Sequence, residues 1–203
     1  MPSCICFSQV LLYADDTVLF FTAKTAIELE ASLNNDINRI SSWKQENKLF
    51  LNMSKTEYVI YGSHQQLKRE DSISLFCNGS SLTKSFKYLG VVIDQHLSFN
   101  NHIEHVVNKV SRKLGVFRRL RISNPMAAAE RLNKTMISPI FDYCDVAWHG
   151  CGKVNSDVLE SLQHRAAKFI FPNSGVDTKE LNATLGLVPL INRRKLHIVL
   201  FLI

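Results

Sequence analysis

The spacing of apolar residues changes character near the middle of the chain, and this change limits the folds available to it. Before residue 100, most apolar residues fall in short runs separated by turn-forming residues, which is typical of strands. From residue 102 they recur at intervals of three and four, as on one face of a helix. The sequence therefore predicts an α+β fold, with a mixed first half over residues 1–100 and an all-helical second half over residues 101–203.

The positive charge is concentrated in the helical half. Residues 1–101 hold 9 basic and 10 acidic side chains, whereas residues 102–203 hold 15 basic and 8 acidic ones. A near-neutral half joined to a basic half favours an anionic partner, either nucleic acid or a membrane surface. The longest C-terminal apolar run, residues 196–203, is far shorter than the roughly 20 residues that span a bilayer, so no membrane partner is expected.

The cysteines indicate the compartment. Five are present, an odd number, and none has the spacing of a metal site. Reduced, mostly buried thiols are typical of intracellular proteins, so we expect a nuclear or cytoplasmic location.

The most specific local feature is the segment 9–21. Two apolar runs flank Ala14-Asp15-Asp16-Thr17, which predicts a hairpin with two adjacent carboxylates at its tip. Such a pair costs free energy unless a cation lies beside it, and polymerases use carboxylates in this way to hold two Mg²⁺ ions. A solvated Asp-Asp turn is the alternative, although an ordinary surface turn need not lie between two buried strands.

Further elements follow from local signals. Thr25-Ala-Ile-Glu28 predicts a capped helix over residues 25–43. Short strands are expected over residues 48–52 and 57–61, with a hairpin turn at Asn78-Gly79 and a strand-like run over 86–93 that Gly90 interrupts. Later helices are expected over residues 102–121, 125–138, 157–171, 178–185 and 189–203.

Several motifs, taken in order, resemble the reverse transcriptases of non-LTR retrotransposons of the LINE and jockey kind. The resemblance extends from about residue 9 to 203. It rests on Tyr13-Ala14-Asp15-Asp16, Trp43 to Glu57, Lys87 to Asp94, Ile137 to Tyr143 with Trp148, Leu159 to Gln163 with Arg165, and Leu185 to Leu190 with Arg193-Arg194. It implies a right-hand fold in which residues 1–100 form the last part of the palm, with a primer-grip hairpin, and residues 101–203 form the thumb and the region downstream.

The resemblance also implies roles in catalysis. Asp15 would be a direct ligand of the catalytic Mg²⁺, with Mn²⁺ as the alternative ion, and Asp16 would be a weaker or outer ligand. Lys55 lies where the family has a lysine proposed to protonate the leaving pyrophosphate. A solvated lysine at a strand edge is the equal alternative for Lys55.

Nucleic-acid contacts are expected at three places. By the resemblance, Tyr13 would lie near the primer end, and Tyr88-Leu89-Gly90 would form the primer grip, where Gly90 allows a close approach of the backbone. Trp148 and Tyr143 are expected in the core. The helix 102–121 has an apolar stripe that faces the core, so its basic side chains are expected largely on the outer face, where they would contact phosphates without reading sequence. They are Lys109, Arg112, Lys113, Arg118, Arg119 and Arg121. A solvated helical face is the alternative.

The implied function is RNA-directed DNA polymerase, with an RNA template, a DNA primer and dNTP as partners. The family's fingers and its other metal-binding palm aspartate would precede residue 1, so we expect a truncated copy of an element that is inactive alone. Two alternatives remain, a non-catalytic nucleic-acid-binding module and a decayed relic that does not fold stably. The sequence leaves the oligomeric state open.

Overall fold

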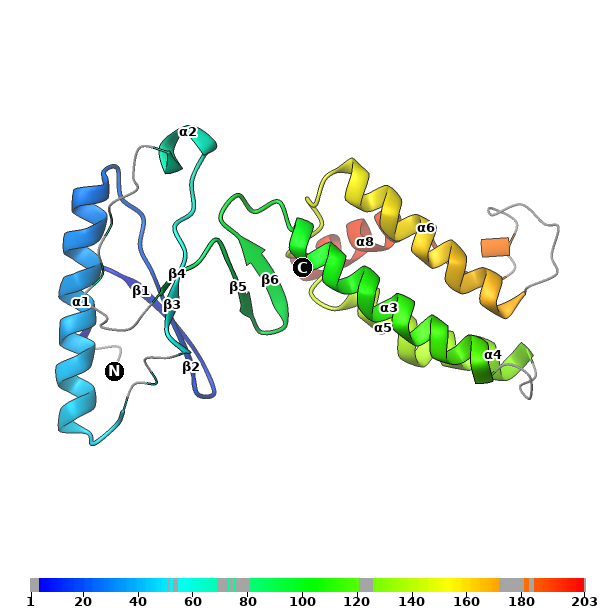
Figure 1. Cartoon of the computed structure of the whole chain (residues 1–203), viewed down its shortest axis with the longest axis horizontal. Helices are drawn as coiled ribbons and strands as arrows, with labels where there is room; N and C mark the ends of the chain where they lie inside the picture. The colour runs from blue at the N-terminus through cyan, green and yellow to red at the C-terminus, as the bar shows by residue number, and fades with distance from the viewer. Residues whose placement is uncertain are drawn as a thin grey trace. The chain divides into compact units, whose positions relative to one another are not determined.

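The computed structural model describes residues 4–50, 52, 55–68, 73, 75, 81–120, 126–171, 181–182 and 185–202. The fold is α+β, as predicted, and the chain divides into two compact units, Met1–Phe86 and Lys87–Ile203 (Figure 1). The predicted boundary between palm and thumb, at residue 100, is a separate matter and stays a prediction. Arg121, the turn at Asn78-Gly79 and most of the predicted helix 178–185 lie outside the described residues.

The first unit begins with an antiparallel hairpin. Strand β1 (Gln9–Tyr13) pairs with β2 (Asp16–Phe20) in a register that places Tyr13 opposite Asp16, which leaves Ala14 and Asp15 as a two-residue loop. This is the hairpin predicted from the sequence, with the two carboxylates at its tip.

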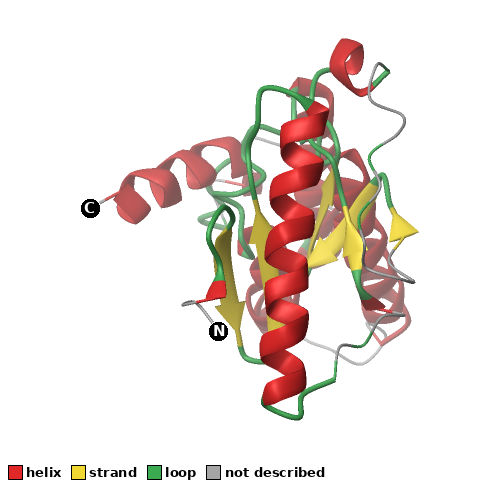
Figure 2. Cartoon of the chain, turned by 90° about the vertical axis from the view of Figure 1, so that its left-hand side faces the viewer, coloured by secondary structure: helices red, strands yellow, loops and turns green. Residues whose placement is uncertain are grey.

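Helix α1 (Ala26–Glu46) follows and runs alongside the strands of the first unit (Figures 1 and 2). It begins as predicted, with the Thr25 hydroxyl accepting a hydrogen bond of 3.3 Å from the Glu28 N–H. It ends three residues later than expected. The Asn47 N–H donates to the Trp43 carbonyl and the Leu49 N–H to the Lys44 carbonyl, so these groups close the helix.

The expected strand over residues 48–52 is therefore wrong for residues 48–50, because their backbone completes the helix end. Lys48 adopts a φ of 55° there, in the left-handed region. Of the next expected strand only β3 (Glu57–Tyr58) forms, and it pairs in parallel with β4 (Ser81–Leu82). Between them lies the short helix α2 (His64–Leu67).

A buried aspartate anchors the chain before β1 to helix α1. The Asp36 carboxylate accepts hydrogen bonds from three consecutive backbone N–H groups, those of Cys6 at 2.9 Å, Phe7 at 3.0 Å and Ser8 at 2.6 Å. Burial raises the pKa of Asp36, but these hydrogen bonds together outweigh it, and the pKa lies below its usual value. The start of the hairpin is thus fixed to α1 by one ionised side chain.

The second unit combines a hairpin with helices. Strands β5 (Ser85–Tyr88) and β6 (Val91–Asp94) pair with each other, and α3 (Asn100–Leu120) follows. The next helical stretch is α4 (Met126–Leu132), a π-helical segment (Asn133–Ile137) and α5 (Ser138–Asp142), where a single helix to residue 138 was expected. Pro139 cannot donate a backbone hydrogen bond, and the widened turns directly precede it. Helices α6 (Lys153–Ile170) and α8 (Leu190–Leu202) complete the unit.

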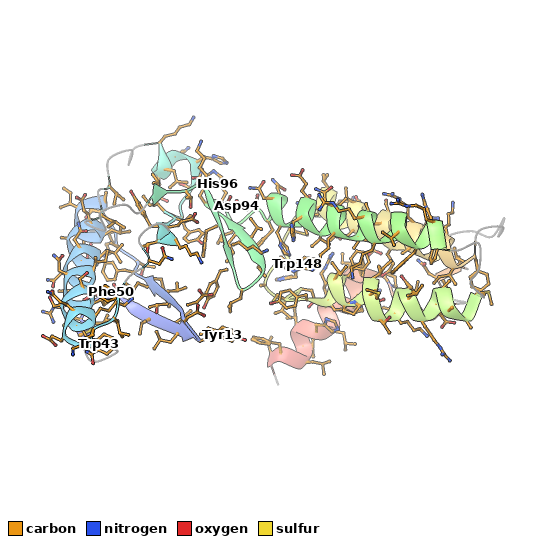
Figure 3. The ribbon with its side chains drawn as sticks, turned by 60° about the horizontal axis from the view of Figure 1, so that its bottom comes forward. Tyr13, Trp43, Phe50, Asp94, His96 and Trp148 are labelled. Carbon is orange, nitrogen blue, oxygen red and sulfur yellow. The ribbon has the colours of Figure 1, made fainter. Side chains whose placement is uncertain are left out.

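The core of this unit lies between α3 and α6. The predicted apolar stripe of α3 is largely buried, and it packs with buried side chains of α6 that include Leu159, Leu162 and Ala166. Of its six predicted residues, Val107 is only half-buried, and the other five are each 5% exposed or less. Those five are Ile103, Val106, Val110, Leu114 and Phe117. Trp148 joins this core, as predicted, and Figure 3 shows it among the helices.

An ion pair, a histidine–aspartate contact and a buried arginine dock helix α8. Arg193 Nε lies 2.7 Å from Asp142 Oδ1, and His197 Nδ1 lies 2.6 Å from Asp145 Oδ2. The buried Arg194 donates to the Ser156 hydroxyl at 2.7 Å and lies over the Trp148 ring at 5.4 Å. None of the helices in the described ranges is long and apolar enough to cross a membrane.

Candidate nucleic-acid interface and metal ligands

The tip of the β1–β2 hairpin presents both predicted metal ligands to solvent. Asp15 is the second loop residue and Asp16 begins β2, and both side chains are exposed. Ala14, the first loop residue, has a φ of 52°, a region that a residue with a Cβ adopts at a cost of about 1–2 kcal/mol. Tyr13 stands beside them, 61% exposed, and Figure 3 shows it at this end of the hairpin.

The expectation that the flanking strands are buried is wrong. Leu11 and Leu12 are 50% and 51% exposed, and Phe20 is 40% exposed. One residue of β1 and two of β2 are half-buried, and the other residues of the two strands are exposed. Apolar side chains of this hairpin are therefore only partly covered.

The donor chemistry at the tip fits a hard divalent cation, but the ligand set is incomplete. Carboxylate oxygens are the ligands that Mg²⁺ prefers, and such an ion is usually held by one or two carboxylates together with substrate phosphates and water. Within the described ranges, no third His, Cys, Asp or Glu ligand lies close enough to join Asp15 and Asp16.

Lys55 precedes strand β3 and is exposed. Its backbone N–H donates to the Asn52 carbonyl at 3.1 Å. No hydrogen bond or ion pair joins its side chain to Asp15 or Asp16 in the part of the chain that the structure describes. The two aspartates are neighbours at the hairpin tip, and their proposed relation to Lys55 stays a prediction.

The basic residues of α3 lie on the outer side of that helix. Lys109, Arg112, Arg118 and Arg119 are exposed, and Lys113 is half-buried. By helical periodicity, Arg112 and Arg119 lie two turns apart and opposite the buried stripe, and Arg118 lies to one side. Lys109 and Lys113 lie one turn apart, on the side of the buried stripe opposite to Arg118. We call Lys109, Arg112, Lys113, Arg118 and Arg119 the basic face.

The β5–β6 hairpin contains the predicted primer-grip residues. Leu89 and Gly90 form its two-residue turn, with φ values of 45° and 87°. A Cβ added to Gly90 would lie 3.2 Å from the ring of Tyr143, so a tyrosine from the end of α5 packs against this glycine. Tyr143 is 52% exposed, which makes its expected place in the core wrong.

A series of hydrogen bonds and a ring contact holds this hairpin on the helices. The Val92 N–H donates to Nδ1 of His102 at 3.3 Å, and the His102 ring lies 5.6 Å from the Trp148 ring. Trp148 Nε1 donates to the Tyr143 carbonyl at 3.0 Å. Sequence reasoning did not find these contacts, because the partners lie up to 46 positions apart and no local pattern joins them.

After β6, one carboxylate organises the approach to α3. Asp94 accepts hydrogen bonds from the backbone N–H groups of His96, Ser98 and Phe99 and from the Ser98 hydroxyl. Burial raises the pKa of Asp94, but these bonds together hold it below its usual value. Asp94 and His96 are labelled in Figure 3.

A cluster at the base of α8 has no local sequence signal and was not predicted. Ligand atoms of Asp142, Asp145 and His197 lie within 4.8 Å of one another. Burial raises the pKa of Asp142, although Arg193 and His197 partly offset this effect. Because the Arg193 guanidinium already pairs with Asp142, and His197 Nδ1 lies 2.6 Å from Asp145 Oδ2, the cluster is a set of polar contacts that docks α8.

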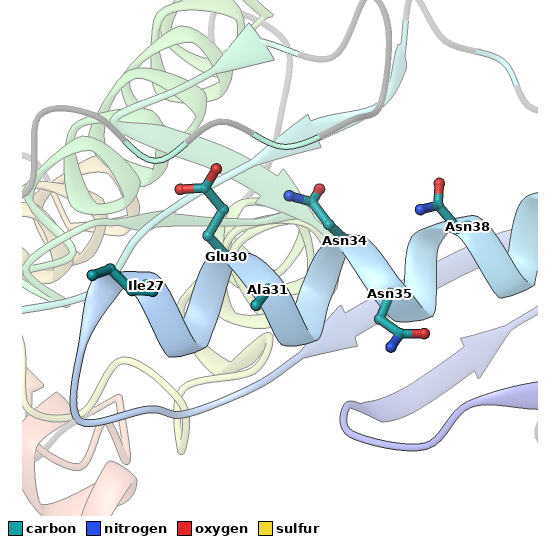
Figure 4. A pocket seen from close by; sticks show the side chains of 6 residues that line it. All are labelled: Ile27, Glu30, Ala31, Asn34, Asn35 and Asn38. Carbon is teal, nitrogen blue, oxygen red and sulfur yellow. The ribbon is translucent and has the colours of Figure 1, made fainter.

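A hollow on the surface of α1 carries none of the predicted residues. Ile27, Glu30, Ala31, Asn34, Asn35 and Asn38 line it (Figure 4). It therefore has no part in the expected polymerase chemistry.

The known proteins that this chain resembles in sequence are all of one kind. Over about 80% of its length this chain is similar to RNA-directed DNA polymerases of mobile elements, and the resemblance to the reverse transcriptases of non-LTR retrotransposons is thereby confirmed at the level of the family. No protein-family model matches the chain, and no solved structure does.

Three relatives illustrate the similarity. The chain is 20% identical over 172 residues to the probable RNA-directed DNA polymerase from transposon X-element of Drosophila melanogaster, and 22% identical over 161 residues to that from transposon BS of the same organism. It is 21% identical over 170 residues to the RNA-directed DNA polymerase from mobile element jockey of Drosophila funebris. The matches cover 80%, 78% and 79% of this chain but 18% of each relative, so the chain spans less than a fifth of their length.

Proposed function

We propose that this chain is a template–primer-binding part of a non-LTR retrotransposon reverse transcriptase, and that it acts with an RNA template, a DNA primer and dNTP. In this proposal the β1–β2 hairpin is the metal-binding tip of the palm, the β5–β6 hairpin is the primer grip, and α3 is a thumb helix. The order of these elements along the chain and the similarity to the three relatives support it.

The observation that carries the proposal is the two-sided character of α3. One side buries five apolar residues in the core, and the other presents the basic face. Such a face suits a run of phosphates, and its contacts would hold a duplex without reading its sequence. Arg119 Nε donates to the Gly115 carbonyl at 3.4 Å, and no basic-face side chain forms an ion pair in the described part of the chain, which leaves their charges available for an anionic ligand.

In catalysis the carboxylates of Asp15 and Asp16 would hold Mg²⁺, or Mn²⁺ as the alternative. The bound ion would lower the pKa of the primer 3′-hydroxyl and neutralise charge on the nucleotide phosphates. Lys55 would donate a proton to the leaving pyrophosphate. The exposure of all three side chains is compatible with these roles.

We further propose that the chain binds nucleic acid but does not extend a primer alone, because two exposed carboxylates do not fix the geometry of two ions. The test uses the 203-residue chain with an RNA–DNA hybrid that has a recessed DNA 3′ end. Binding is measured by fluorescence anisotropy at low salt, and extension with dNTP and Mg²⁺. We expect binding without incorporation.

Two sets of variants sharpen this test. Asp15→Ala and Asp16→Ala should leave binding intact, whereas a variant with four basic-face residues changed to Gln should bind at least tenfold more weakly. Those four are Lys109, Arg112, Lys113 and Arg119. A matched control removes the same charge elsewhere by changing Lys24, Lys48, Lys153 and Lys168 to Gln. Equal loss in both charge variants would contradict a specific basic face, and incorporation that depends on Asp15 would show that the chain is catalytically complete.

A further inference from the structure

We propose that Tyr143 is a positioning residue that fixes the turn of the β5–β6 hairpin for contact with the primer. The inference rests on the proposed function, since it concerns how the primer-grip hairpin keeps its shape. It begins from an unusual turn, whose two residues, Leu89 and Gly90, both have positive φ.

The sequence of this turn does not favour its conformation. A two-residue turn with positive φ at both positions matches the type I′ pattern, which favours Asn, Asp or Gly at its first position. Leu89 stands there with a φ of 45°, at a cost of about 1–2 kcal/mol. Backbone strain of this kind persists only where surrounding contacts impose it, and it clusters at functional sites.

Tyr143 supplies such contacts. Its hydroxyl donates a hydrogen bond of 2.6 Å to the Leu89 carbonyl, and its ring packs where a Cβ on Gly90 would meet it at 3.2 Å. One side chain thus contacts both turn residues. Gly90 is required by its φ and by this ring, so a bulkier residue there would displace Tyr143.

Tyr143 is itself held firmly. Its backbone N–H donates to the Pro139 carbonyl at 3.1 Å, and its carbonyl accepts from Trp148 Nε1 at 3.0 Å. Trp148 is 1% exposed, and its ring lies 5.6 Å from the His102 ring and 5.4 Å from the Arg194 guanidinium. The core therefore determines where the tyrosine hydroxyl lies, and the hydroxyl in turn determines the path of the turn.

Tyr143 lies at the surface, so its role in the turn is distinct from the packing of a core residue. Its side chain is 52% exposed, so it contributes less burial than a core aromatic residue would. The hydrogen bond closes a circuit of contacts that runs from the turn through Tyr143, Trp148 and His102 back to strand β6 at Val92. The hairpin is thus fixed to the helices at two points, at Leu89 in the turn and at Val92 in β6.

The test compares the wild-type chain with Tyr143→Phe, which removes only the hydroxyl. Hydrogen exchange is followed with and without the RNA–DNA hybrid that has a recessed DNA 3′ end, and the affinity is measured in parallel. In the wild type we expect the hybrid to slow exchange in both the β5–β6 hairpin and α3. Tyr143→Phe should lose the protection of the hairpin, keep that of α3, and bind at least threefold more weakly.

A rescue variant distinguishes positioning from general stability. Leu89→Asn places in the turn a residue that accepts positive φ, so the double variant Leu89→Asn with Tyr143→Phe should regain the slow amide exchange that the hairpin has in the free wild-type chain. The rescue is scored by exchange in the free chain, because Leu89 itself belongs to the proposed primer grip. Tyr58→Phe is the matched control, because it removes a hydroxyl that donates to the Ile73 carbonyl at 3.4 Å, outside this circuit, and it should change neither readout.

The outcomes separate the inference from the proposed function. Wild-type binding with protection of α3 but not of the hairpin, or hairpin protection that survives in Tyr143→Phe, would overturn the inference and leave nucleic-acid binding standing. Failure of Leu89→Asn to rescue would also overturn it, because the tyrosine would then act through something other than the turn. Absence of any binding by the wild type would overturn both.

Discussion

The backbone N–H of Val92 in β6 donates a 3.3 Å hydrogen bond to Nδ1 of His102 in the first turn of α3. A protonated imidazole has no acceptor, so this contact requires the neutral ring. His102 is 3% exposed, and burial, with a smaller contribution from the charge of His105, lowers its pKa to about 4. The docking of the hairpin on the helices is therefore sensitive to acid.

We expect the free energy of unfolding to fall between pH 6.5 and pH 4 because of His102. The unfolded imidazole takes up a proton near pH 6.5, whereas the folded one resists protonation until about pH 4. The contribution is fully present above pH 6.5, falls through this window, and amounts to on the order of 3 kcal/mol. Urea unfolding at a series of pH values measures it.

The control for this prediction is His102→Gln. It keeps a hydrogen-bond acceptor but cannot titrate, so it should flatten the curve over that window. A wild-type stability that stays constant from pH 6.5 to pH 4.5 would rule out the buried neutral imidazole.

The basic face predicts a specific salt dependence. Each phosphate contact contributes about 0.9 to the slope of log affinity against log salt on duplex DNA. Arg112→Gln should therefore lower the magnitude of the slope by about that amount. Arg131→Gln, an exposed arginine on α4, is the matched control and should leave the slope unchanged. Anisotropy titrations at several salt concentrations measure both, and equal slopes for the two variants would argue against the contact.

The anchor at Asp36 predicts a loss of stability in the first unit. Asp36→Asn replaces a carboxylate that accepts three backbone N–H groups by an amide with one acceptor oxygen, at a cost of about 1–3 kcal/mol. Thermal unfolding should show a lower midpoint, and hydrogen exchange should speed up at Cys6, Phe7 and Ser8. The exposed Glu46→Gln is the control on the same helix. If Asp36→Asn melted like Glu46→Gln, the anchor would be energetically unimportant.

The tip of the first hairpin predicts a stabilising substitution. Ala14 has a φ of 52°, which glycine adopts without the clash of a Cβ. Ala14→Gly should therefore stabilise the hairpin by about 0.5–1 kcal/mol, after allowance for the greater flexibility of glycine when unfolded. Slower amide exchange in β1 and β2 would show it. Ala14→Val should destabilise the hairpin and speed up this exchange. Faster exchange in Ala14→Gly than in Ala14→Val would show that the positive φ of Ala14 does not strain the turn.

The sequence predicted most where periodicity and local chemistry act. The α3 stripe, the start of α1 at Thr25 and the β1–β2 turn all depend on neighbours within four residues, and all three form as predicted. The extent of α1 was not predicted, because its end uses backbone groups of Asn47 and Leu49 that carry no distinctive side-chain signal.

The contacts that organise the candidate site could not be predicted in the same way. The Tyr143 hydroxyl and its acceptor at Leu89 are 54 positions apart, and His197 and Asp145 are 52 positions apart. Nothing in the local sequence distinguishes a tyrosine that supports a turn from one that fills a core, so Tyr143 was assigned to the core. The exposure of Leu11 and Leu12 was missed for a related reason, since an apolar strand predicts that a covering layer exists but not which part of a protein supplies it.

The length of the basic face sets how a polymerase could use it. From Lys109 to Arg119 the helix rises about 15 Å, which matches about four base-pair steps along a duplex. All contacts of the basic face would be to backbone phosphates, which are chemically identical and evenly spaced. Such contacts can break and re-form one base pair further along the duplex at little cost in free energy. In the proposed thumb role, the basic face would let the growing product advance by one nucleotide after each addition without releasing it.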